Sequence, residues 1–137
     1  MIWISIDMEK DFQAWHDKKQ AIHSYKARPF FREREVWICS MGTNIGFEED
    51  GSGERFLRPV VILKKLSKEI LWGLPLTKTR RVGEYYFQMT PIGGSQVSVA
   101  MFLHLRSLDS KRLFYKIGDV GEEEFLEIKK RLTRLIG

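Results

Sequence analysis

Between residues 35 and 104 the apolar residues of this chain lie in short runs that are separated by glycine and proline. Such runs are typical of β-strands, because an amphipathic helix needs an apolar stripe that continues over about ten residues or more. In the last run, alternate residues from 97 to 103 are large and apolar, a period of two that a helix does not produce. The pattern predicts five strands, at Glu35–Ser40, Pro59–Leu66, Glu69–Leu76, Tyr85–Met89 and Ser95–His104.

Both ends of the chain are predicted to be helical. Over Asp7–Ser24 apolar residues recur at helical spacing, and Arg28-Pro29 ends this helix because the residue before a proline is pushed out of the α region. Over Glu122–Leu135 an apolar stripe runs between an acidic first turn and a basic last turn, as the helix macrodipole favours. Five strands between two helices predict a mainly β (α+β) fold: a small, partly open antiparallel barrel whose C-terminal helix covers one edge or face.

Length and charge limit the kind of protein this is. The 137 residues suffice for one hydrophobic core, and two cores would each bury too little surface. No apolar run approaches the roughly 20 residues of a membrane span, and the N-terminus lacks the basic region of a signal peptide. A formal charge of +5 favours polyanionic partners weakly, and a solvated basic surface explains it equally well. We therefore expect a soluble cytoplasmic protein with no membrane partner.

The only cysteine and the three histidines form no metal motif in the sequence. Cys39 ends the apolar run Val36-Trp37-Ile38-Cys39, which predicts a core residue rather than a nucleophile, and a single cysteine forms no intrachain disulfide. His16 and His23 are seven residues apart on the predicted helix, about 10 Å along its axis, too far to share one ion. We expect no metal and no cofactor.

Gly42–Glu54 contains four glycines and almost no apolar side chains. This composition predicts a long exposed connection, which is either a lid over a site or a flexible hairpin loop.

Basic and hydroxyl residues gather where the predicted strands begin and end. Arg55 and Arg58 precede Pro59, Thr77-Lys78-Thr79-Arg80-Arg81 follows Pro75, and Arg106-Ser107 follows His104. Guanidinium groups bind phosphate bidentately and hydroxyls donate to its oxygens, so converging strand ends would form a phosphate-transfer site. From spacing alone, solvated charges that cap strands are the stronger reading of these clusters.

The motifs around these clusters strongly resemble the PemK/MazF family of toxin endoribonucleases. The resemblance lies in segments that follow one another in the family's order: Glu33-Arg34-Glu35-Val36-Trp37, Arg58-Pro59-Val60-Val61-Ile62-Leu63, Leu74-Pro75-Leu76-Thr77, Leu105-Arg106-Ser107-Leu108-Asp109-Ser110-Lys111-Arg112-Leu113, Lys116-Ile117-Gly118 and Glu122-Glu123-Glu124. It covers about residues 31 to 136. Residues 1–30 are accordingly interpreted as an N-terminal helical extension, and 31–137 as the barrel domain.

The resemblance implies an SH3-like barrel that forms a homodimer and cleaves single-stranded RNA without a metal, leaving a cyclic phosphate and a 5′-hydroxyl. It places the principal catalytic arginine at Arg58 and a catalytic threonine at Thr77. It also implies that the basic and hydroxyl residues of the strand-end clusters bind RNA: Arg55, Lys78, Arg80, Arg81, Arg106 and Ser107. The partners that the resemblance implies for this protein are single-stranded RNA and a cognate antitoxin whose tail folds over the RNA groove.

Two positions depart from the family pattern. Where many members have glutamine, preceded in several by an acidic residue, this chain has His104 and Leu103, and Ser107 replaces a frequent threonine. His104 is a candidate for the missing proton carrier, because imidazole exchanges protons at neutral pH. A polar residue that contacts RNA or the barrel is the other interpretation of His104.

Two functions compete with RNA cleavage. The same barrel dimer serves toxins that poison DNA gyrase without cutting nucleic acid, although Arg58 and Thr77 argue against that role here. The loss of the acidic residue also leaves open a barrel that binds nucleic acid or antitoxin and has no activity.

Overall fold

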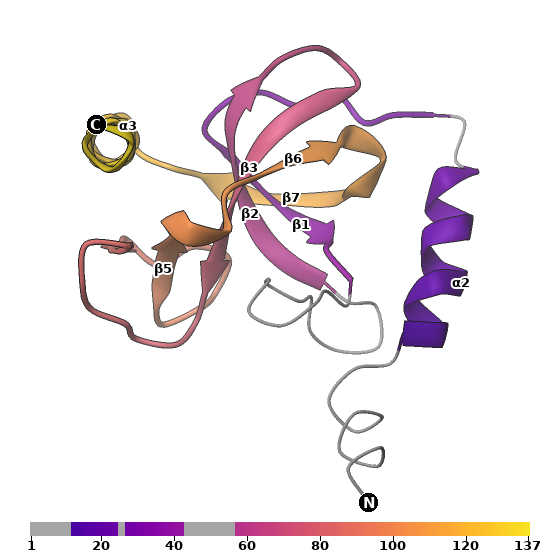
Figure 1. The fold of residues 1–137 in the computed structure, drawn as a ribbon, viewed down its shortest axis with the longest axis horizontal. Helices are drawn as coiled ribbons and strands as arrows, with labels where there is room; N and C mark the ends of the chain where they lie inside the picture. The colour runs from indigo at the N-terminus through magenta and orange to yellow at the C-terminus, as the bar shows by residue number, and fades with distance from the viewer. Residues whose placement is uncertain (1–11, 25–26, 43–56) are drawn as a thin grey trace, which may run out of the picture.

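The computed structural model describes residues 12–24, 27–42 and 57–137, which form a β-sheet flanked by two helices (Figure 1). The helices are α2 (Phe12–His23) and α3 (Glu122–Ile136). Seven strands and two short 3-10 helices lie between them: β1 (Glu35–Ser40), β2 (Leu57–Lys65), β3 (Ile70–Thr77), β4 (Tyr86–Met89), β5 (Ser98–Met101), η1 (Phe102–His104), β6 (Arg106–Asp109), η2 (Ser110–Arg112) and β7 (Leu113–Asp119). The described residues contain no helix long and apolar enough to cross a membrane.

The strands form one antiparallel sheet in the order β4-β5-β3-β2-β1-β7. Strand β3 carries two partners along one edge, because its residues 70–73 pair with β6 and its last two pair with β5. The turn of η1 joins these two partners and lets the sheet bend around β3. The predicted partly open antiparallel barrel is confirmed.

The loop between β4 and β5 crosses to β7, the strand at the opposite end of the sheet order. Gly93 has a φ of +69°, and a Cβ at this residue would lie 2.7 Å from Cδ1 of Ile117 in β7. Only glycine combines this backbone conformation with so close an approach. The loop therefore lies against the open side of the barrel at this point.

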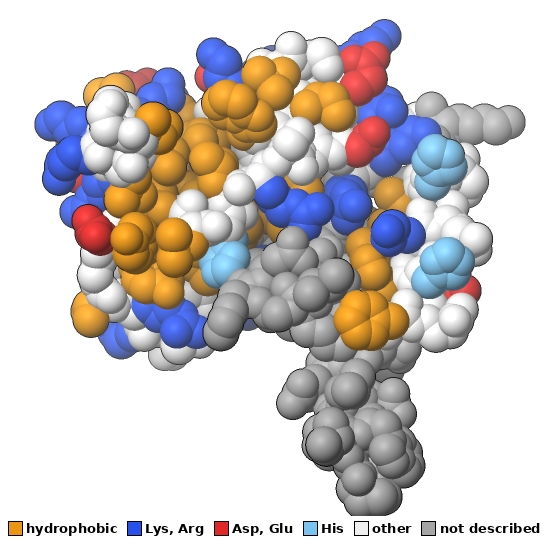
Figure 2. Space-filling view, in the orientation of Figure 1, with side chains coloured by type: hydrophobic (Ala, Val, Ile, Leu, Met, Phe, Trp, Pro, Cys, Tyr) orange, Lys and Arg blue, Asp and Glu red, His pale blue; other side chains and the backbone are white. Residues whose placement is uncertain are grey.

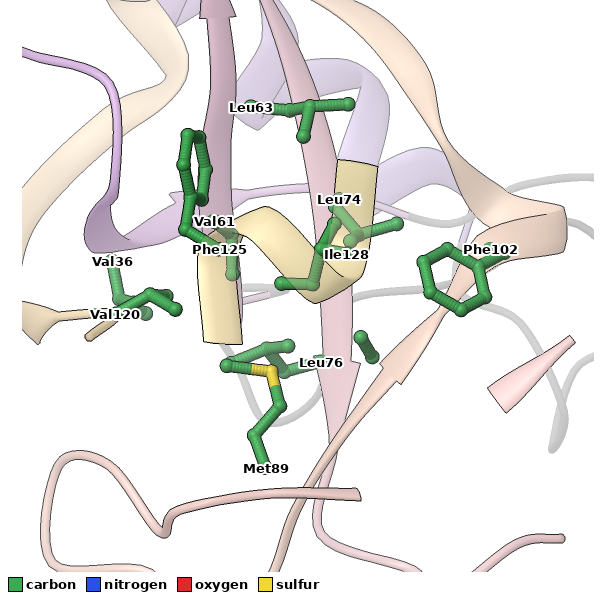
Figure 3. Packing of buried hydrophobic residues seen from close by; sticks show 11 residues of the cluster. Val36, Val61, Leu63, Leu74, Leu76, Met89, Phe102, Val120, Phe125 and Ile128 are labelled. Atoms are coloured by element: carbon green, nitrogen blue, oxygen red, sulfur yellow. The ribbon is translucent and has the colours of Figure 1, made fainter. Parts of the chain in front are cut away.

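Two apolar clusters fill the two faces of the sheet. The larger one lies between the sheet and α3, whose Phe125 and Ile128 are buried against residues that include Val61 and Leu74 (Figure 3). Leu132 and Leu135 pack on the same cluster, so the apolar stripe predicted for this helix is confirmed. The other cluster lies around Phe31, Trp37, Cys39, Met41, Val60, Ile62, Leu71, Leu108 and Leu113.

Helix α2 contacts the barrel through the ring of Trp15 and through a hydrogen bond of 3.1 Å from Lys111 Nζ to the carbonyl oxygen of His23. The ring of Trp15 covers Gly42, where an added Cβ would lie 1.9 Å from Cε2 of that ring. Gly42 has a φ of +78°, in the left-handed region that favours glycine. The Arg112 guanidinium lies 5.5 Å from the centroid of the Trp15 ring. The predicted start of this helix, at Asp7, lies outside the described residues.

The strand predictions need three corrections. Strands β6 and β7 were not predicted, so the described residues form seven strands rather than five. The predicted strand Ser95–His104 is regular only over Ser98–Met101, and the chain then turns into η1. The expected alternation also fails, because all four residues of β5 are buried whereas Leu103 is 62% exposed. His104 consequently lies in a 3-10 helix and not at the end of a strand.

Candidate active site

A cleft of about 250 Å³ opens where β2 begins and β3 ends, beside the β4–β5 loop. Strands β1 and β7 supply its remaining wall. The lining residues are Ile38, Leu57, Arg58, Pro59, Leu76, Thr77, Lys78, Ile92, Gly93, Ser95, Val97, Ser98, Tyr115 and Ile117. The cleft is therefore built from five strands, the β4–β5 loop and Lys78 of the β3–β4 connection, and its geometry depends on the assembled barrel.

Arg58 lies in β2, opposite Cys39 of β1, and its side chain is half-buried. Its Nη1 donates a hydrogen bond of 3.2 Å to the carbonyl oxygen of Leu76 on the neighbouring strand. A guanidinium has five N–H donors, and this bond uses one of them to orient the group at the cleft. Sequence analysis placed Arg58 just before a strand, whereas it lies inside β2, held from both sides by the sheet.

Thr77 is the last residue of β3 and is buried at the base of the cleft. Its Oγ1 accepts a hydrogen bond of 3.2 Å from the backbone N–H of Thr79. Since that bond occupies a lone pair of the oxygen, the hydroxyl hydrogen is left to be donated to another group. Lys78 follows at the exposed rim of the cleft.

The cleft is electropositive. Arg58 and Lys78 are its charged lining residues, and no carboxylate is found among the described residues that line it. Serine hydroxyls add polar groups: Ser98 is buried and its Oγ accepts a bond of 3.1 Å from the backbone N–H of Ile92. Two cations and several hydroxyls over an apolar wall suit a phosphodiester with its attached base.

The match to known families decides what kind of protein carries this cleft. A model of the PemK-like, MazF-like toxins of type II toxin–antitoxin systems matches residues 32–136. The chain belongs to this family. The resemblance read from the sequence motifs is thereby confirmed. No curated protein sequence matches the chain significantly.

Several solved structures share the fold. The crystal structure of MazF (Form-I) from Deinococcus radiodurans has a TM-score of 0.62 at 18% identity, covering 82% of this chain and 99% of that one. The MazE–MazF structure (Form-II) from the same organism has a TM-score of 0.59 at 18% identity, covering 80% and 98%. A Mycobacterial endoribonuclease in complex with its cognate antitoxin has a TM-score of 0.58 at 17% identity, covering 79% and 96%.

The toxin fold brings together only some of the residues that the sequence suggested. Arg58, Thr77 and Lys78 line one cleft. Arg80 and Arg81 are exposed in the β3–β4 connection, where the Arg81 guanidinium lies 5.9 Å from the centroid of the Tyr86 ring. Arg55 and most of the predicted lid, Gly42–Glu54, lie outside the described residues.

Arg106 and Ser107 lie on β6 and His104 lies in η1, at a different level along β3 from Thr77. Thr77 is opposite Val99 of β5, whereas Gly73 is opposite Arg106 of β6. Four residues of strand, about 13 Å, therefore separate the level of Thr77 from that of Arg106, with His104 in the intervening turn. The described lining of the cleft does not include these three residues.

Sequence analysis missed Ser98 and Tyr115 as cleft residues. Tyr115 is 49% exposed on β7, and its ring lies 5.2 Å from that of Phe114 with the planes inclined at 60°. An exposed aromatic ring beside two cations is a platform on which a nucleic-acid base can stack. Recognition of β7 as a strand would have been the signal, because it places Tyr115 next to β1.

No metal centre was found within the described part of the chain. No group of three or more His, Cys, Asp or Glu side chains in that part is placed to hold a metal ion. Cys39 is a core residue, as predicted, and burial raises the pKa of its thiol. Its thiol is thus neither exposed nor ionised as a nucleophile would be.

Proposed function

We propose that the protein is the toxin of a type II toxin–antitoxin pair and acts as a metal-independent endoribonuclease on single-stranded RNA. The observation that carries this proposal is the Arg58 guanidinium, held against the Leu76 carbonyl in an electropositive cleft with Thr77 and Lys78. Two similar structures that are described as endoribonucleases support it.

In the proposed reaction, the 2′-hydroxyl of one ribose attacks the adjacent phosphorus and the bond to the 5′-oxygen of the next nucleotide breaks. The products are a 2′,3′-cyclic phosphate and a 5′-hydroxyl. The 2′-hydroxyl gives up one proton and the leaving oxygen gains one, while the pentavalent intermediate carries an extra negative charge.

Arg58 stabilises that charge. A preorganised guanidinium interacts more strongly with the phosphorane than with the ground-state phosphate, and this difference lowers the activation barrier of RNA cleavage. Thr77 donates its hydroxyl hydrogen to a phosphate oxygen, since its Oγ1 already accepts from Thr79. Lys78 at the rim binds a flanking phosphate, and Tyr115 stacks on a base.

His104 is proposed as the proton carrier, while Arg55, Arg80, Arg81, Arg106 and Ser107 are proposed to contact the RNA outside the cleft. Two protein partners complete the proposal. We expect a homodimer, which sedimentation would reveal as a species of about twice 16.1 kDa. We also expect a cognate antitoxin that inhibits cleavage, in keeping with the neighbours described as a MazE–MazF structure and as a complex with a cognate antitoxin.

The deciding experiment is cleavage of a mixed RNA pool by purified wild-type, Arg58→Ala and Arg58→Lys proteins. Loss of one preorganised donor typically lowers the rate by about 100–1,000-fold, and RNA affinity should fall far less. Arg58→Lys keeps the charge but loses the planar fork, so it should stay impaired. Cleavage should persist in excess EDTA because Arg58 supplies the charge stabilisation. Near-wild-type cleavage by Arg58→Ala, or EDTA inhibition reversed by magnesium, would refute the proposal.

A gyrase-poisoning toxin of the same fold is the competing function. It predicts no RNA cleavage by the wild-type protein and inhibition of gyrase supercoiling that survives Arg58→Ala. Both assays on the same preparation separate the two functions.

A further inference from the structure

A second cavity, of about 230 Å³, lies between α2 and the turn that joins β6 to β7. Its lining residues are Lys19, Ile22, His23, Arg28, Asp109, Lys111 and Arg112. On the face seen in Figure 2, Lys and Arg side chains gather between the sheet and the place that α2 occupies in Figure 1. Helix α2 precedes the residues that match the toxin family, so the family's barrel alone would lack half of this cavity.

The cavity is strongly cationic. Four lysine and arginine side chains line it against one carboxylate, Asp109. That carboxylate is already engaged, because it forms an ion pair with Arg28 and accepts a bond of 2.8 Å from the backbone N–H of Lys111. Lys111 Nζ donates a bond of 3.1 Å to the carbonyl oxygen of His23, which is a neutral group. The described lining residues therefore carry more positive charge than Asp109 can balance.

Arg112 is fixed in place by its surroundings. Its Nη1 donates a bond of 3.1 Å to the carbonyl oxygen of Ser40, and its guanidinium lies over the Trp15 ring of α2. Burial, together with the neighbouring Arg106 guanidinium, lowers the pKa of Arg112. A held guanidinium whose charged form is penalised by burial would be stabilised by an anion in the cavity.

The cavity lies one strand away from the cleft. Cys39 of β1 is opposite Arg58 of β2 on one side and opposite Leu113 of β7 on the other. Two strand spacings, about 10 Å, therefore separate the strand of the catalytic arginine from the strand that follows Arg112. A nucleic-acid strand that leaves the cleft across β1 reaches this cavity within a short length.

We propose that the cavity binds backbone phosphate of the same single-stranded RNA, flanking the segment held in the cleft. The inference rests on the proposed function for the identity of the ligand. A phosphate is favoured over an acidic peptide because Ile22 is the one apolar lining residue in the described part of the chain, whereas peptide tails need apolar anchors. Helix α2 then extends the RNA-binding surface beyond the barrel.

The test measures RNA affinity without cleavage. Fluorescein-labelled 2′-O-methyl RNAs of 20 and of 5 nucleotides lack the attacking hydroxyl, and fluorescence anisotropy at several salt concentrations gives their affinities. The variants are Lys19→Glu with Lys111→Glu, and the milder Lys19→Gln with Lys111→Gln. The matched control is Lys129→Glu with Lys130→Glu on the exposed side of α3, which lies across the barrel from α2 in Figure 1.

We expect the charge-reversed cavity variant to bind the 20-nucleotide RNA at least about tenfold more weakly than the control variant does. Affinity for the 5-nucleotide RNA should stay unchanged, and the glutamine variant should lower the salt slope of the longer RNA by about 1.4, near 0.7 for each cation lost. Circular dichroism and melting curves, with the glutamine variant, separate lost binding from lost folding.

Equal affinities of the cavity and control variants for the long RNA would overturn the inference. Poly-glutamate serves as an acidic-peptide probe in the same assay. If the cavity variant lost affinity for poly-glutamate while its RNA affinity stayed unchanged, the cavity would bind acidic peptide, and the inference would also be overturned. The binding assay uses 2′-O-methyl RNAs that cannot be cut, so it is independent of the cleavage assay. If Arg58→Ala still cleaved RNA, the proposed reaction would be refuted, and the affinities measured for the cavity variants would still test this inference.

Discussion

Arg58 and Thr77 are linked through one peptide group. The carbonyl that accepts the Arg58 hydrogen bond belongs to Leu76, the residue that directly precedes Thr77. Displacement of the guanidinium therefore removes a hydrogen bond from the peptide group that joins Leu76 to Thr77. At the scale of single residues, the proposed chemistry depends on two donors whose positions are set by the same pair of strands, β2 and β3.

Thr77→Val should remove the proposed hydrogen bond to the phosphate while preserving the shape of the side chain. We expect the cleavage rate to fall by about 100-fold. The Thr79 N–H also loses its acceptor, which should cost about 1 kcal/mol of stability. Single-turnover cleavage and a melting curve measure the two effects. Thr77→Ser keeps the hydroxyl and should cleave within a few-fold of wild type, and similar losses in both variants would contradict the assigned role.

His104→Gln tests whether the imidazole carries a proton. A proton carrier predicts that the substitution lowers the single-turnover cleavage rate while RNA affinity is kept. The strand distance of about 13 Å from Thr77 makes this test necessary, because direct transfer needs the reacting ribose to lie near His104. An unchanged cleavage rate at saturating RNA, with weaker RNA binding, would assign His104 to RNA binding instead.

At the scale of elements, the contact of Trp15 in helix α2 with the barrel requires a glycine at residue 42. Gly42→Ala places a methyl group inside the Trp15 ring and forces alanine into the left-handed region. We expect a loss of about 1–3 kcal/mol in the free energy of unfolding, with α2 displaced from the barrel. Urea denaturation and proteolysis of the N-terminal segment measure this. Gly121→Ala is the control, because Gly121 has a φ of −60° and an added Cβ would meet nothing within 4 Å.

The elements differ in how far the sequence could predict them. Helix α3 was predictable because one side faces the core and the other faces solvent, so its apolar stripe follows the helical period. Strand β5 was misjudged because both of its faces are buried, which removes the alternation. Strands β6 and β7 were not predicted because neither shows a clear apolar pattern. Strand β6 buries one large apolar side chain, Leu108, and β7 exposes Phe114 and Tyr115.

The candidate site was predictable in the same uneven way. Arg58 and Thr77 were identified by the family motifs, and adjacent strands carry them. Ser98 and Tyr115 come from β5 and β7, which are far from β2 in the sequence, and only tertiary pairing brings them to the cleft beside Arg58. The cationic cavity at Arg112 was missed for the same reason, because α2 and η2 are separated by most of the chain.

At the scale of the whole molecule, acid should destabilise the barrel through Glu35. Burial alone would raise the pKa of this carboxyl, but bonds from Trp37 Nε1, the Arg32 N–H and Lys116 together hold it below its usual value. A pKa that is lower in the folded state gives stability that is present above the unfolded value, near 4.3, and lost as pH falls through the folded value.

We therefore expect the melting temperature to stay level from about pH 7 to pH 5 and to fall below about pH 4. Glu35→Gln should lower the melting temperature at pH 7 and reduce the decline in acid. Thermal melts in a series of buffers measure this. Asp109, whose pKa is also lowered against burial by Arg28, contributes in the same direction, so some decline should remain in the variant.

The pairing of β1 with β7 has a consequence for synthesis. Residues 35–40 cannot complete their hydrogen bonds until residues 113–119 have emerged from the ribosome, because domains fold as units once their long-range partners are present. Ile38 from the first strand and Tyr115 from the last form parts of the same cleft wall. A nascent chain thus lacks the finished cleft until residues 113–119 have emerged and paired with β1.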